Sequence, residues 1–210
     1  MRMRWESLFD DMESQLEQEL GAEDAQLRAE EERLRLGRLT LRGRLAALSR
    51  QTDAASGPLR LELRSGAHVT VRALTFGRDW LAGEIAPAGW PAAGGAQCVI
   101  PLASVAGVLL ERSAVERSLE EQPAAPARLA ERIGLAFVLR DLCRRRAGIE
   151  VDCGLRPSGA AWLLHGTIDR VGRDHCDLAL HEAGTPRRES LVTGYRIVPF
   201  EQIMMVRLSG

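Results

Sequence analysis

Gly77-Arg78-Asp79-Trp80-Leu81 returns as Gly172-Arg173-Asp174-His175-Cys176, 95 residues further along the chain. Two more pairs of segments match in the same order, Val99-Ile100-Pro101-Leu102 with Ile197-Val198-Pro199-Phe200, and Arg35-Leu36-Gly37 with Arg132-Ile133-Gly134. Self-similarity at a nearly fixed spacing indicates that one structural unit is used twice. The sequence therefore predicts a duplicated fold.

Alternation of apolar and polar residues predicts short strands in both halves. Leu59, Leu61 and Leu63 alternate with charged residues, and alternation resumes at Val69 after a Ser-Gly turn. Further strands are expected up to Ile85, at 98–100 and at 105–110, with a Pro/Gly/Ala loop at 87–95. The same order is expected to resume at residue 149, after a helix over 127–146.

Helical spacing of apolar residues marks the start of the chain. Their stripe consists of Trp5, Leu8, Phe9, Met12, Leu16 and Leu20. Gly21 is expected to end this helix, and 22–48 is predicted to be a second long helix that is ended by a Ser-Gly-Pro stretch at 56–58. The leucines expected along the buried side of that second helix are Leu27, Leu34, Leu41, Leu45 and Leu48.

The composition is that of a globular protein, because 45% of the 210 residues are hydrophobic. All 28 basic residues are Arg, and neither Lys nor Asn occurs, which indicates a GC-rich genome such as that of an actinobacterium. The four cysteines have no paired spacing, and no apolar run approaches the roughly 20 residues that cross a bilayer. We expect a cytoplasmic protein with reduced thiols and no membrane contact.

The order of elements resembles the Sm-like small β-barrel. The residues that carry the resemblance are Gly66, Val71, Gly77-Arg78-Asp79, Ile100-Pro101-Leu102 and Val105 in the first half, and Gly159, Gly166-Thr167-Ile168, Gly172-Arg173-Asp174, Val198-Pro199-Phe200 and Ile203 in the second. The resemblance implies an α+β fold, with two helix-led five-stranded Sm-like small β-barrels in tandem and an N-terminal helical arm. The expected domains are an acidic arm (1–32), the first barrel with its helix (33–110), a connector (111–127) and the second barrel with its helix (128–210).

The residues with which Sm-like proteins bind RNA are missing here. The family uses an Asn after the Asp of the turn, whereas Gly83 and Leu178 stand four residues after Asp79 and Asp174. An Arg-Gly pair is also absent from the corresponding second loop. The usual RNA pocket is therefore not expected, and both aspartates are interpreted as turn formers.

No set of residues in the sequence suggests catalysis, a cofactor or a metal. Serine-nucleophile elbows and phosphate-binding Gly loops are missing, and alternation along a strand would place the adjacent His175 and Cys176 on opposite faces, so no Cys is given a nearby His base. A zinc site could draw only on scattered side chains without metal-ligand spacing, namely Cys153, His165, His175, Cys176 and His181. We therefore expect a protein that is not an enzyme and carries no cofactor.

Charge is unevenly distributed along the chain. Residues 1–32 carry eleven acids and three Arg, whereas 33–50 carry six Arg and no acid. On a continuous helix Arg35, Arg38 and Arg42 would share one face, which could bind phosphates or an acidic partner. The alternative is that Glu30, Glu31 and Glu32 neutralise this face, or that the acidic first helix folds back on it as an α-hairpin.

Three functional hypotheses follow, of which the third is a mainly structural protein that assembles with copies of itself. The first is a protein-binding adaptor or regulatory subunit that contacts an unidentified partner through the arm residues Trp5, Leu8, Phe9 and Met12, or through barrel edges that could also join copies of the chain. The second is RNA or DNA binding through arginines of the helix and of the barrel rims, namely Arg35, Arg38, Arg42, Arg78, Arg173, Arg187 and Arg188.

Overall fold

The computed structural model describes residues 3–49, 57–86, 95–120 and 129–208 of the chain, except for the side chains of 3–8 and Asp11. The chain forms two compact units, Met1–Thr40 and Leu41–Gly210. Most of the loop expected at 87–95, and the Ser56 part of the expected helix stop, lie outside the described residues.

The N-terminal unit is a single helix, α1 (Met3–Gly37), which runs through Gly21 without a break. The predicted stop at Gly21 is wrong, because one Gly in a helix costs only about 1 kcal/mol and strong helix formers surround it. The predicted helix over 22–48 is also wrong, since α1 ends at Gly37 and a separate helix, α2 (Leu41–Ser49), begins the second unit.

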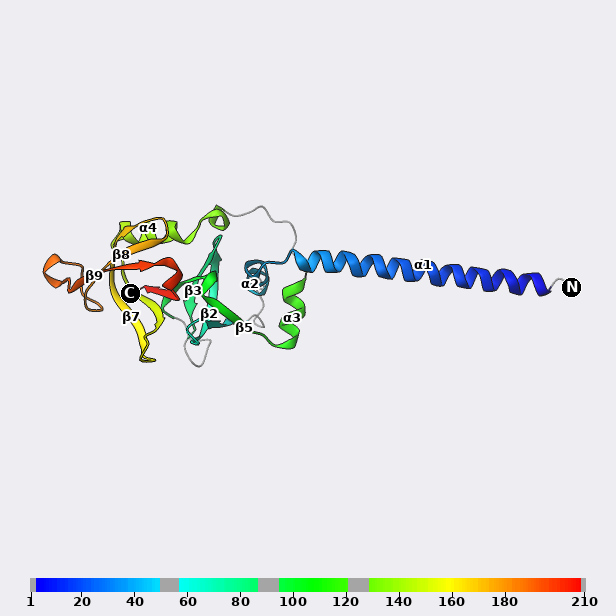
Figure 1. The fold of residues 1–210 in the computed structure, drawn as a ribbon, viewed down its shortest axis with the longest axis horizontal. Coiled ribbons are helices and arrows are strands. Elements are labelled where there is room, and N and C mark those ends of the chain that lie inside the picture. The colour runs from blue at the N-terminus through cyan, green and yellow to red at the C-terminus, as the bar shows by residue number, and fades with distance from the viewer. Residues whose placement is uncertain (1–2, 50–56, 87–94, 121–128, 209–210) are drawn as a thin grey trace. The chain divides into compact units, whose positions relative to one another are not determined.

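The second unit contains one antiparallel sheet of ten strands (Figure 1). The strands are β1 (Leu59–Leu63), β2 (His68–Phe76), β3 (Trp80–Ile85), β4 (Gln97–Pro101), β5 (Val105–Leu109), β6 (Gly148–Leu155), β7 (Ala161–Val171), β8 (His175–Leu180), β9 (Gly194–Pro199) and β10 (Met205–Leu208). Their order in the sheet is β5-β1-β2-β3-β4-β10-β6-β7-β8-β9. Each half thus presents the same strand order, which is what a repeated unit predicts.

The prediction of two closed five-stranded barrels is wrong. The sheet is open, and β4 of the first half pairs with β10 of the second through the partners Val99 and Val206. We call this β4–β10 pairing the seam. Because the seam joins the halves edge to edge, β5 and β9 are the outermost strands of one continuous sheet.

Helices cover parts of this sheet. The predicted connector contains a helix, α3 (Arg112–Leu119), whose buried Ser118 accepts hydrogen bonds from Arg44 of α2 at 3.2 and 2.8 Å. The helix expected over 127–146 is shorter, α4 (Leu135–Arg145), and a 3-10 turn (Leu129–Arg132) precedes it. Three more 3-10 turns follow strands or loops, at Leu102–Ser104, Glu189–Leu191 and Phe200–Gln202.

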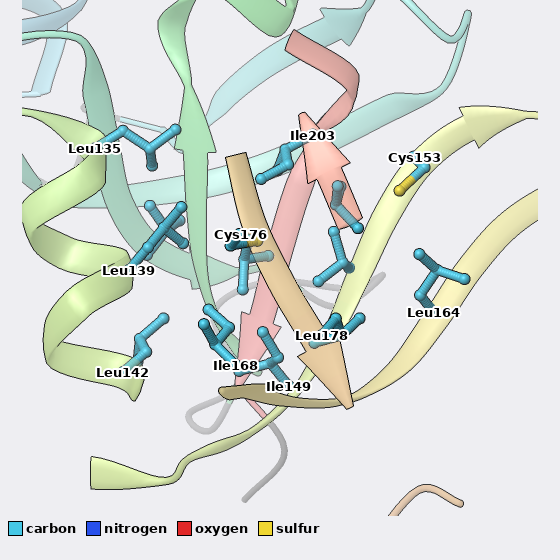
Figure 2. Packing of buried hydrophobic residues seen from close by; sticks show 14 of the residues in the cluster. Leu135, Leu139, Leu142, Ile149, Cys153, Leu164, Ile168, Cys176, Leu178 and Ile203 are labelled. Atoms are coloured by element: carbon cyan, nitrogen blue, oxygen red, sulfur yellow. The ribbon is translucent and has the colours of Figure 1, made fainter. Parts of the chain in front are cut away.

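Two hydrophobic cores lie on the sheet, and each takes residues from both halves. In the second-half core, Leu135, Leu139 and Leu142 of α4 point toward the strands that carry Ile168 and Cys176 (Figure 2). Trp80 and Val99 of the first half belong to this same core. The first-half core conversely contains Met204 and Met205 from the C-terminal end of the chain. The two halves therefore share their apolar packing.

Candidate functional site

A stripe of exposed apolar side chains runs along α1. Its described members are each more than half exposed, and they are Phe9, Met12, Leu16, Leu20, Leu27 and Leu34. The prediction that Leu27 and Leu34 are buried is therefore wrong, and it is also wrong for Leu41, which begins α2 and is exposed, whereas Leu45 is buried as predicted. Trp5 and Leu8 lie within α1, but their side chains are outside the described residues. We call the six described side chains the α1 stripe.

The stripe is long and acidic residues flank it. At a rise of 1.5 Å per residue, Phe9 and Leu34 are separated by roughly 37 Å along the helix. Near the C-terminal end of α1, acids pair with arginines one turn away: Glu30 with Arg33 at 3.3 Å and Glu32 with Arg35 at 2.6 Å. The hydrogen bond from Arg35 holds the pKa of Glu32 below its ordinary value. These pairs support the sequence alternative in which local acids neutralise the Arg-rich segment.

The arginines predicted to bind nucleic acid do not share one helix. Arg35 lies in α1 and Arg38 follows its end, whereas Arg42 lies in α2. The Arg42 guanidinium donates a hydrogen bond from Nε to the Gly77 carbonyl oxygen at 2.6 Å and lies 3.4 Å from Glu131. Arg42 thus ties α2 to the turn between β2 and β3.

The remaining predicted arginines occupy different settings. Arg78 lies 3.6 Å from Asp79, and Arg187 makes two hydrogen bonds of 2.7 Å to Asp169. Arg173 and Arg188 are exposed. Arg187 is therefore poorly placed to bind a ligand, because 18% of its side chain is exposed against 69% for Arg78.

The two repeated aspartates have different roles. Asp79 accepts a hydrogen bond from the backbone N–H of Leu135, the first residue of α4, at 2.8 Å. Asp174 is paired with its neighbour His175, whose hydrogen bond lowers the pKa of the carboxyl. The interpretation of both residues as simple turn formers misses the cap that Asp79 provides to a distant helix.

A row of ionisable side chains crosses the second half of the sheet. Strand register places Arg207 of β10 opposite Glu150 of β6, and Glu150 opposite His165 of β7. Arg207 forms an ion pair with one Glu150 oxygen, and His165 Nε2 lies 3.3 Å from the other. His181 follows, because its backbone N–H donates to the His165 carbonyl oxygen. Sequence reasoning missed this row, since only the register between separate strands creates it.

A hollow of about 270 Å³ lies beside this row. Its lining includes Gly148, His165, Gly166, His181, Thr185 and Pro186. The buried His181 places Nδ1 3.1 Å from the Glu182 carbonyl oxygen and Nε2 2.9 Å from the Thr167 hydroxyl. Both ring nitrogens of His181 are thus occupied by the fold itself.

The cysteines have the character of buried structural thiols. All four are free, and Cys98, Cys153 and Cys176 are buried. Burial raises the pKa of Cys98 and Cys153 to about 11 and that of Cys176 to about 12, which disfavours the reactive thiolate. Among the described residues, no three His, Cys, Asp or Glu side chains are grouped so that they could hold a metal ion.

No protein-family model, curated protein or solved structure matches the chain. Among the helices in the described part of the chain, none is both long enough and apolar enough to cross a bilayer. The resemblance to Sm-like proteins stays a prediction from the sequence pattern.

Proposed function

We propose that this chain is a non-enzymatic protein-binding adaptor that acts in the cytoplasm and uses α1 to bind its partner. The observation that carries the proposal is the α1 stripe, whose side chains are more than half exposed over seven helical turns or so. Apolar side chains at helical spacing are the anchors with which a helix binds a groove on another protein. The sheet of the second unit serves as the scaffold that bears the helix.

The chemistry of α1 defines the partner that fits it. Residues 1–32 carry eleven acids against three Arg, so the surface around the stripe is strongly negative. An apolar groove bordered by basic side chains is complementary to such a helix, because opposite charges favour encounter and fix the register. We therefore propose a protein with a basic-rimmed apolar groove as the partner.

Nucleic-acid binding is less well supported by the arginines. Arg35, Arg42 and Arg78 each lie within 4.0 Å of a carboxylate, and Arg42 also bonds a backbone oxygen. A guanidinium in such a pair has to give up that contact before it can neutralise a phosphate. The acidic surface of α1 would in addition repel a polyanion.

The test is affinity capture with three full-length baits. Leu16→Asp with Leu20→Asp breaks the stripe, and Ser14→Asp with Gln18→Asp adds the same charge to the opposite face of α1. We expect one set of proteins to be retained by the wild type and by the Ser14/Gln18 variant, and to be lost with the Leu16/Leu20 variant. A purified member of that set should then bind the wild-type chain directly.

Two results would count against the proposal. Identical protein sets on all three baits would show that the stripe does not recognise the partner. Retention that disappears on nuclease treatment would instead assign the binding to nucleic acid.

A further inference from the structure

β9 is the counterpart in the second half of β4 in the first half. The free edge of β9 therefore corresponds to the edge of β4 that forms the seam. In the sheet order, β4 lies between β3 and β10, and β9 lies beside β8 at the end of the sheet. Among the strands of the described residues, none pairs with the free side of β9. The first half thus has a partner strand at an edge where the second half has none.

The sequences of the two edges correspond residue by residue. Segments 99–110 and 197–208 align without a gap, so Ile197 takes the position of Val99. Both strands end in a proline with nearly equal backbone angles, φ −61° and ψ 133° at Pro101 and φ −61° and ψ 141° at Pro199, and a 3-10 turn follows each. β9 therefore has the geometry of a seam strand.

Burial distinguishes the two positions sharply. Val99 is 5% exposed, because it packs with Val206 in the core of the neighbouring half. Ile197 is 66% exposed, and Tyr195, which precedes it on the same face of β9, is 59% exposed. Ile197 and Tyr195 thus expose large side chains on a strand whose outer edge is unpaired. Another strand can add to such an edge.

The backbone groups of Ile197 face the open edge as well. Residues of an antiparallel strand alternate between bonding one neighbouring strand and facing the other side. The backbone N–H of Phe200 donates to the carbonyl oxygen of Asp174 at 2.8 Å. In the same way, the backbone N–H of Leu102 donates to the carbonyl oxygen of Asp79 at 2.9 Å. Phe200 and Leu102 therefore bond the inner strand. Ile197 and Val99 lie three residues before them, so in this alternation their N–H and C=O groups are directed away from the inner strand.

The strand that matches this edge is β5 at the other end of the sheet. In the gapless alignment Val108 of β5 takes the position of Val206, the seam partner of Val99. Val108 packs against the first-half core, as Val206 packs in the second-half core. β5 is the terminal strand on its side of the sheet.

We infer that β9 of one copy of this chain pairs antiparallel with β5 of a second copy, with Ile197 opposite Val108, and so repeats the seam between molecules. Such head-to-tail contacts generate rings or open chains rather than symmetric dimers. The seam inside the chain also buries Met204 and Met205, whereas β5 has Ala106 and Gly107 at these positions. The contact between copies is therefore weaker than the internal seam and depends on protein concentration.

Sedimentation velocity of the full chain over a wide concentration range tests this inference. We expect reversible association of the wild type, a large loss of association in Ile197→Lys, and no loss in Leu74→Lys, which adds the same charge at an exposed apolar residue of β2. The repeated register also places Leu109 opposite Arg196 of the second copy, so Leu109→Lys should weaken association and Leu109→Glu should strengthen it.

Mixing the variants gives the decisive result. Ile197→Lys keeps the β5 edge intact and Leu109→Lys keeps the β9 edge intact, so their mixture should form a one-to-one dimer at concentrations at which each variant alone is largely monomeric. Association that Leu109→Lys leaves unchanged would overturn the inference in favour of β9 pairing with β9. A monomeric wild type at the highest concentration would overturn it as well, and association lost only in the Leu16/Leu20 variant would assign self-assembly to α1.

Discussion

The Asp79 carboxylate caps helix α4, which begins 56 residues later in the chain, through a 2.8 Å hydrogen bond from the Leu135 N–H. The neighbouring Trp80 donates from its ring nitrogen to the Ile133 carbonyl oxygen at 2.9 Å, and the Arg78 N–H donates to the same oxygen. One turn of the first half thus holds the start of the second-half helix, whose own cap residue, Gly134, offers no side chain.

Removing this cap should destabilise the protein. We expect Asp79→Ala to lower the free energy of unfolding by about 1 to 2 kcal/mol, the usual cost of losing a helix cap. Asp79→Asn keeps a side-chain acceptor and should retain most of the stability. Urea denaturation monitored by circular dichroism measures both changes.

The repeat supplies a matched control for that measurement. Asp174 stands at the equivalent position but is exposed and bonds only the adjacent His175 ring among the described side chains. Asp174→Ala should therefore leave the unfolding midpoint unchanged. An equal loss of stability in Asp79→Ala and Asp174→Ala would show that each aspartate stabilises its own turn and that Asp79 does not act through α4.

The shared cores predict that the two halves unfold together. Met205 is fully buried in the first-half core although it lies near the C-terminus. Met205→Ala should cost about 2 to 5 kcal/mol, as is typical of a large buried side chain. Hydrogen exchange should then quicken in β1 to β3 as well as in β6. Two separate unfolding transitions would contradict a continuous sheet.

Alkaline pH should weaken the fold through the buried cysteines. Their pKa values rise from an ordinary 9.0 to about 11 for Cys98 and Cys153 and about 12 for Cys176. Unfolded thiols ionise first, so the stabilising contribution is complete below pH 9 and is lost as pH rises through the folded pKa values. Urea unfolding of the reduced protein at a series of pH values should show this decline, and Cys176→Ala should reduce its slope.

Arg42 is expected to contribute to folding and not to ligand binding. Arg42→Ala removes the hydrogen bond to Gly77 and the ion pair with Glu131, and we expect a loss of about 1 to 3 kcal/mol. Arg38→Ala, which changes an exposed arginine, should leave the thermal midpoint unaltered. A larger loss of stability in Arg38→Ala than in Arg42→Ala would show that the contacts of Arg42 with Gly77 and Glu131 are not needed for folding.

The local elements were largely predictable from the sequence. Alternation locates β1 at Leu59–Leu63, because this strand buries every second residue. The matching Pro101 and Pro199 segments likewise locate β4 and β9. Alternation and the repeated Pro segments are properties of the local sequence, so they predict strands without knowledge of tertiary contacts.

The order in which the strands pair in the sheet could not be predicted from the local sequence. Whether β5 and β4 of one half close a barrel or β4 pairs with β10 depends on contacts between distant segments, and alternation is identical in both cases. The Arg207–Glu150–His165 row was missed for the same reason. The continuity of α1 differs from the prediction because a Gly within a helical pattern is a common stop signal, whereas the strong helix formers around Gly21 outweigh its cost.

Site-specific photocrosslinking from α1 in living cells shows whether the α1 stripe contacts a protein partner. A photoreactive amino acid at Leu20 places the crosslinker in the stripe, and one at Gln18 places it on the opposite face of the same turn. We predict a crosslink to a distinct second protein from position 20 and none from position 18. Equal crosslinking from both positions, or crosslinks from position 20 only to nucleic acid, would contradict the claim that the α1 stripe binds a protein partner.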